Sequence, residues 1–176
     1  THMFTLANGL AKRGNEVHLM SGGPPDDERS KKLFNEFLEG DVKHHKIGFP
    51  NYAKFDFFSK VKQLLTYIIL IPKGIYMIRK INPDIIHVHY PVTSYMAWIY
   101  CKLFNKKFVT TYHIKGIPNQ IIHRKANKSI AISSEMIDEL EKRWGYKKKD
   151  ISLVCNGVSK EKFDKNISLK EKLEIK

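Results

Sequence analysis

The sequence predicts an α/β fold in which a parallel sheet is doubly wound with helices. Short β-branched runs alternate with amphipathic helical segments between residues 85 and 155, a pattern typical of parallel strands joined by crossover helices. His89 ends one expected strand, 85–89, and His113 directly follows another, 108–112. Ligands of open parallel sheets bind just beyond the carboxyl ends of the strands. Polar residues at these ends are therefore candidates for chemistry.

The first half of the chain is expected to begin with a helix that stops at Gly14. Its apolar face would comprise Met3, Leu6, Ala7 and Leu10. The next elements are a strand at 16–20, a helix at 27–39, a strand at 42–47 and an amphipathic helix at 57–81. Pro72 should break or kink that last helix. Because a doubly wound fold normally opens on a strand, we expect this chain to lack its first strand.

The second half alternates more regularly. Its expected strands are 85–89, 108–112, 129–132 and 151–155, and its expected helices are 92–104, 118–125 and 134–144. Ser133 or Ser134 would cap the last helix. Strand 16–20 should join these four strands in one parallel sheet. His89 and His113 would then open at the same edge of that sheet.

The charge balance is unusual for a chain of this size. Its 176 residues carry 31 Lys and Arg against 18 Asp and Glu, a formal net charge of +13. Such a charge favours anionic partners, such as nucleic acid, an acidic membrane surface or phosphorylated substrates. Residues 85–134, which include both histidine-bearing strand ends, hold no Asp or Glu.

Cysteine usage and hydropathy indicate a reduced, cytosolic protein. Cys101 and Cys155 are far apart and form no CxxC motif, so neither a disulfide framework nor a zinc knuckle is indicated. The N-terminus lacks the basic-then-apolar pattern of a signal peptide. The longest apolar stretch, 64–71, is too short to span a bilayer.

Five phrases of the sequence resemble, in order, those of family 4 glycosyltransferases, which have the GT-B fold. They are LANGLAKRGNEV at Leu6–Val17, PDIIHVH at Pro83–His89, TYH at Thr111–His113, IAISSE at Ile130–Glu135, and VCNGV at Val154–Val158 with Phe163 after it. The match is to the family's N-terminal half, which implies a Rossmann-like acceptor-binding domain at 1–165. Residues 166–176 would begin a linker toward an absent C-terminal donor domain. Cys155 and Ser159 depart from the family's usual Pro and Asp.

The resemblance implies a retaining glycosyltransferase of the hexosyltransferase type. Such an enzyme would move a sugar from a nucleotide sugar to a cell-envelope or lipid-linked acceptor. No cofactor is implied beyond the nucleotide-diphosphate sugar, which is the donor substrate. The usual proposal for retaining members is reaction at one face of the sugar, and a half without carboxylates around its cleft fits it. The chain alone is expected to be inactive, and to be cytoplasmic or peripheral on the inner face of the membrane.

Six residues are candidates for the site. The resemblance makes His113 the catalytic candidate, because the family's equivalent histidine reaches the donor sugar and its phosphate. With Lys115, an imidazole N–H would stabilise the negative charge that develops on a diphosphate leaving group. His89 and Tyr90 are placed near the acceptor, and Ser133 and Ser134 lie at a helix N-terminus, where anionic groups bind readily.

Several alternatives stay open at this point. His87, His89 and His113 could form a three-histidine zinc site, although we favour a packed, structural His87 and no metal. The basic amphipathic stretch 49–80 would either lie on an anionic membrane or pack as an ordinary helix. A non-catalytic Rossmann-like module, or a separate subunit that pairs with a donor domain, is the main rival function. Nucleic-acid binding ranks last, since no binding signature accompanies the charge.

Overall fold

The computed structural model describes residues 2–23, 27–37, 41–48, 57–89, 91–113, 115–116 and 123–157. The elements in order are α1 (His2–Ala11), β1 (Val17–Ser21), α2 (Glu28–Phe37), β2 (Val42–Lys46), α3 (Phe57–Ile81), β3 (Ile85–Val88), α4 (Pro91–Phe104), β4 (Lys107–Tyr112), β5 (Lys128–Ala131), α5 (Ser134–Lys142), the 3-10 turn η1 (Lys148–Asp150) and β6 (Ile151–Leu153). This alternation confirms the α/β class. Each expected strand is present within one or two residues of its expected bounds.

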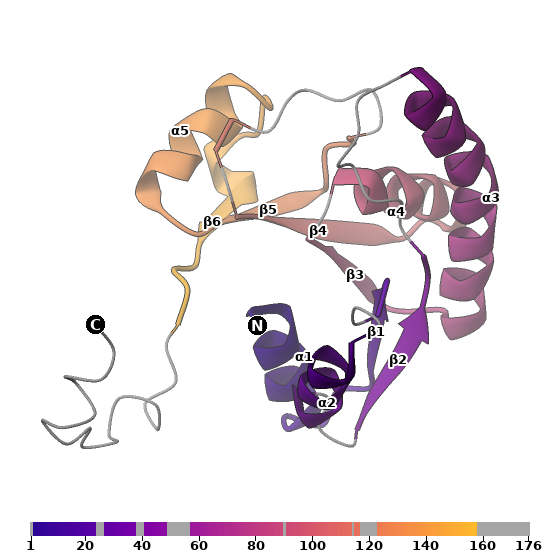
Figure 1. The fold of residues 1–176 in the computed structure, drawn as a ribbon. Helices are drawn as coiled ribbons and strands as arrows, with labels where there is room; N and C mark the ends of the chain where they lie inside the picture. The colour runs from indigo at the N-terminus through magenta and orange to yellow at the C-terminus, as the bar shows by residue number, and fades with distance from the viewer. Residues whose placement is uncertain are drawn as a thin grey trace, which may run out of the picture.

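The described strands form two parallel sheets. One has the order β1-β2 and the other the order β3-β4-β5-β6, and every pair is parallel. Helices α4 and α5 pack on the four-stranded sheet, and α1 packs on the β1–β2 pair. Figure 1 shows α4 and α5 above the four-stranded sheet and α3 at the right, with α1 and α2 lower down, to the left of β1 and β2. The arrangement is Rossmann-like and doubly wound, as expected.

The expectation of a single sheet is wrong in one respect. No hydrogen-bonded pairing joins β1 to β3 among the described strands. In the doubly wound order 3-2-1-4-5-6, the first strand of the fold lies between the second and the fourth. The two described sheets, β2-β1 and β3-β4-β5-β6, correspond to the strands on either side of that first strand. The fold order thus predicts an unpaired slot between β1 and β3, and each of these strands has one edge without a strand partner in the described part of the chain.

Filling this slot is expected to stabilise the protein. A strand-forming segment joined ahead of residue 1 would run parallel to β1 and β3 and hydrogen-bond to both edges. We expect the melting temperature to rise by roughly 5 °C or more, with less aggregation because exposed strand edges are covered. Calorimetry and light scattering measure both effects. A proline at the centre of the segment cannot donate a strand hydrogen bond. If that variant raised the melting temperature equally, the added segment would not be pairing with β1 and β3.

The core is divided among three clusters. The largest joins α3, α4, β3 and β4 and includes Met96, Tyr100 and Phe108, and a second joins the end of β4 to α5. The third packs α1 on β1 and β2. Gly74 brings α3 close to α4, because a Cβ there would lie 2.1 Å from Met96 Sδ. This close approach fixes which face of α3 is turned inward.

Three local expectations need correction. Leu10 is 37% exposed instead of sharing the core face, and Phe4 and Ala11 pack beside Ala7 there. Helix α3 continues through Pro72, so the expected break is wrong, whereas the alternative of a kink stays a prediction. Residues 123–125 are not helical, and the rest of the expected helix 118–125 lies outside the described residues.

Candidate functional site

The candidate site lies where β3 and β4 end. These strands pair in register with His87 opposite Val109 and Val88 opposite Thr110, so the residues that follow them emerge side by side. His89 Nδ1 lies 3.0 Å from His113 Nε2, and the two rings stack with centroids 5.3 Å apart. Both side chains are half-buried. The prediction that they open at the same edge of the sheet is confirmed.

His87 extends this pair into a row of three imidazoles. Its ring stacks on His89 with centroids 4.3 Å apart, and its Nε2 lies 2.7 Å from Thr111 Oγ1. Successive rings are tilted by only 30° and 20°, so the three imidazoles form a stacked row. Within the described ranges, no group of three His, Cys, Asp or Glu side chains is arranged to hold a metal ion.

The loop after β4 is tied to α5 by carboxylates. Lys115 Nζ donates to Glu135 Oε2, and the Gly116 N–H donates to Glu139 Oε1 at 2.9 Å. The hydrogen bond from Lys115 lowers the pKa of Glu135 below its ordinary value. The expectation of a cleft half without carboxylates is therefore wrong for this loop. The Lys115–Glu135 ion pair is exposed. Exposed ion pairs are weak, so a phosphate group can compete with Glu135 for the Lys115 ammonium.

The α5 N-terminus lies at the same edge of the sheet, since β5 is the neighbour of β4. Ser133 occupies the N-cap position with an extended backbone, as expected, but its side chain makes no capping hydrogen bond. Ser134 begins the helix and is exposed. The structure thus brings Ser133 and Ser134 to the edge that holds His113, whereas Tyr90 lies outside the described residues.

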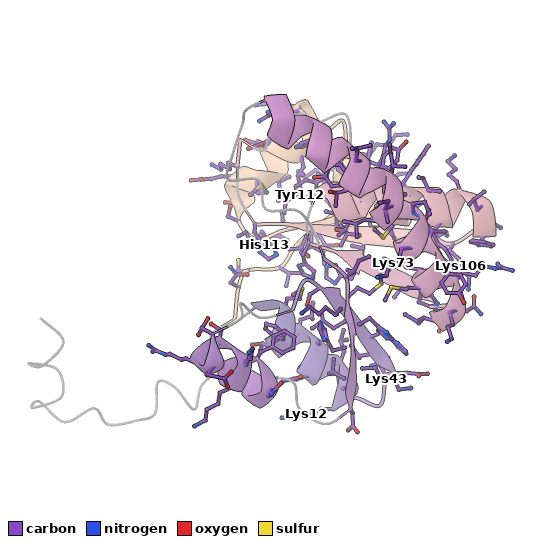
Figure 2. All side chains as sticks on the ribbon, turned by 45° about the vertical axis from the view of Figure 1, so that its right-hand side comes forward. Lys12, Lys43, Lys73, Lys106, Tyr112 and His113 are labelled. Carbon is purple, nitrogen blue, oxygen red and sulfur yellow. The ribbon has the colours of Figure 1, made fainter. Side chains whose placement is uncertain are left out.

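A buried hydrogen-bond network supports the end of β4, and it was not predicted from the sequence. His123 Nε2 lies 2.7 Å from Tyr112 Oη, and His123 Nδ1 lies 3.3 Å from Ser94 Oγ. Tyr146 Oη accepts the Ala126 N–H at 2.8 Å and lies 3.4 Å from Tyr112 Oη. Burial lowers the pKa of His123 to about 4. Tyr112 directly precedes His113 (Figure 2), so this network positions the catalytic candidate.

A second histidine pair joins β1 and β2. His18 Nδ1 lies 2.8 Å from His45 Nε2, and their rings stack with centroids 5.0 Å apart. Glu16 Oε1 lies 3.1 Å from His18 Nε2 and accepts from Lys43 Nζ. Burial is the main cause that lowers the pKa of His45. Sequence reasoning missed this pair because the two residues are 27 positions apart, and only the parallel pairing of β1 with β2 brings them together.

The fold is that of a Rossmann-like domain, and the candidate site lies at the carboxyl edge of its parallel sheet. The profile of the family described as Glycosyltransferase Family 4 matches residues 1–162. The chain belongs to this family.

Two solved structures resemble the chain. A glycosyltransferase from Rickettsia africae ESF-5 is 24% identical with a TM-score of 0.65, and the match covers 99% of this chain and 44% of that one. A sucrose-phosphate synthase from Thermosynechococcus elongatus is 16% identical with a TM-score of 0.57, and the match covers 97% of this chain and 92% of that one. No curated protein matches the sequence. The likeness shows the fold, and the chain spans less than half the length of the Rickettsia protein.

Proposed function

We propose that this chain is the acceptor-binding half of a retaining glycosyltransferase of the hexosyltransferase type. The enzyme transfers a sugar from a nucleotide sugar to a cell-envelope or lipid-linked acceptor. The observation that carries this proposal is the stacked His89–His113 pair, 3.0 Å apart at the ends of β3 and β4, in a chain of Glycosyltransferase Family 4. The division between acceptor and donor halves rests on the family's known organisation.

In this proposal His113 is the catalytic residue. Its imidazole donates a hydrogen bond to the diphosphate leaving group as the bond to the sugar breaks and negative charge develops. His89 holds the His113 ring through the contact between Nδ1 and Nε2, and with Tyr90 it borders the acceptor. When the donor is bound, Lys115 leaves Glu135 and contacts a phosphate oxygen instead. Breaking the ion pair costs little free energy, because the pair is exposed.

The charge of the chain supports a phosphorylated substrate. The net charge is +13, and residues 85–134 contain no carboxylate. A positive field of this kind raises the local concentration of anionic substrates and speeds their association. The amide groups at the start of α5, beside Ser133 and Ser134, favour an anionic group in the same region, because the Ser133 side chain does not occupy them.

The test is a transfer assay with this chain joined to, or mixed with, a nucleotide-sugar-binding domain of the same family. We expect the nucleotide sugar to be consumed only when the two parts are joined and a lipid-linked acceptor is present. Proton NMR of the product should show the anomeric configuration of the donor. An inverted product would contradict the retaining mechanism, and transfer by the isolated chain would contradict the proposed division of labour. Activity on mixing separate parts would favour the rival, a subunit that pairs with a donor domain.

A further inference from the structure

Helix α3 carries a row of apolar side chains on its outer face. Four of them are more than half exposed: Leu65 (56%), Ile68 (60%), Ile69 (69%) and Tyr76 (69%). Pro72 is exposed between them. Positions 65, 68, 69, 72 and 76 recur with the helical period, so they line one face of the helix. At 1.5 Å per residue this apolar row is about 17 Å long.

The row cannot be turned into the core by rotating the helix. The opposite face of α3 is already buried and consists of Tyr67, Leu70 and Ile78 around Gly74. Gly74 packs so closely on Met96 of α4 that a Cβ there would clash with the Met96 sulfur. The inward face is therefore fixed by a specific close contact, and the apolar row is left without a partner among the described residues.

Positive charge surrounds the row. Lys73, Arg79 and Lys80 are exposed residues of the same helix, and Arg79 lies over the Phe104 ring at 4.2 Å, which links α3 to the end of α4. Beyond that end lie Lys106 and Lys107, and Figure 2 shows Lys73 and Lys106 on the same side of the molecule. Between residues 57 and 134 the sequence contains one acidic residue, Asp84.

We propose that the outer face of α3 docks on an anionic membrane surface, with the helix lying in the plane of the lipid headgroups. An amphipathic helix binds in this way when its apolar residues enter the acyl boundary and its basic residues contact anionic lipid. Among the described residues, no helix is long and apolar enough to cross a membrane. The positive charge around the row favours an anionic membrane over a second copy of the chain, because in a dimer the same lysines would face and repel each other.

The experiment is co-sedimentation of the 176-residue chain with lipid vesicles. We expect binding to vesicles of mixed phosphatidylcholine and phosphatidylglycerol to be at least about tenfold tighter than to pure phosphatidylcholine, and to weaken as salt is raised. Ile68→Ser with Ile69→Ser should weaken binding at least about tenfold through lost apolar burial. The matched control is Leu153→Ser with Val154→Ser, which removes two exposed apolar side chains from the end of β6 and should bind normally.

A second pair of variants separates charge from apolar burial. Lys73→Glu with Lys80→Glu should abolish the preference for anionic vesicles. Lys147→Glu with Lys148→Glu makes the same change of net charge at exposed residues of the η1 region and should preserve it. As an independent measure, Tyr76→Trp should be quenched by brominated lipid, and Leu153→Trp should not. All these positions are exposed, so circular dichroism should confirm unchanged folding.

Two results would overturn the proposal. One is equal binding of the Ile68/Ile69 variant and its control to anionic vesicles. The other is concentration-dependent self-association that the Ile68/Ile69 substitutions abolish, with no vesicle binding by the unaltered chain. The docking face does not rest on the proposed function, since the assay measures lipid binding and no sugar transfer. Loss of docking would leave the His113 proposal intact, and loss of the His113 proposal would leave docking intact.

Discussion

Replacement of His113 by alanine is expected to reduce turnover by about a hundredfold or more, which corresponds to roughly 2.7 kcal/mol of transition-state stabilisation. The reason is that the imidazole would donate to charge that develops on the leaving diphosphate and is small in the ground state. Affinity for the nucleotide should change little, because the other half of the enzyme would hold it. The measurement is steady-state transfer together with nucleotide titration, with His113→Ala in the assembled enzyme.

Two neighbouring substitutions serve as controls for His113. His87→Ala should mainly lower the free energy of unfolding, by about 1–2 kcal/mol, because it removes the hydrogen bond to Thr111 and the stack on His89. His89→Ala should lower turnover less than His113→Ala does, since His89 acts by holding the His113 ring. Full turnover in the His113 variant would remove the residue at the centre of the proposed mechanism.

Protonation of His123 is expected to destabilise the protein between about pH 6.5 and pH 4. Burial lowers the pKa of His123 from 6.5 to about 4 in the folded state. The unfolded chain therefore binds a proton at a higher pH than the folded chain. The stability that neutral His123 contributes is complete above pH 6.5 and is lost as the pH falls toward 4. By linkage, the loss over this window is roughly 3 kcal/mol.

The measurement is urea unfolding at several pH values, compared with His123→Gln. Glutamine can bond to both Tyr112 and Ser94 but does not titrate, so its unfolding free energy should fall less steeply in this window. The carboxyls whose pKa values are lowered, such as Glu135 and Asp150, titrate alike in both proteins and cancel in the difference. If the unfolding free energies of the two proteins fall equally steeply with decreasing pH, the folded state does not lower the pKa of His123. That result would contradict the prediction.

The sequence alone determined the order of elements and the edge at which the site lies. Short apolar runs that alternate with helical segments predicted β3 to β6, because a buried parallel strand needs apolar residues on both faces. The placement of His89 and His113 at one edge followed from topology, since the carboxyl ends of parallel strands meet there. The resemblance of five short phrases to glycosyltransferase family 4 also came from the sequence, and the family match confirms it.

Only the tertiary structure decided which distant side chains meet. The Tyr112–His123–Ser94 network joins residues 11 and 29 positions apart, and no local pattern encodes such a contact. The link of Lys115 to Glu135 likewise depends on how α5 packs beside the end of β4. The amphipathic pattern of α3 was visible in the sequence, but it did not say which face is exposed. The close packing of Gly74 on Met96 settles that choice, because helix rotation is fixed by the nearest backbone contact and not by hydrophobicity alone.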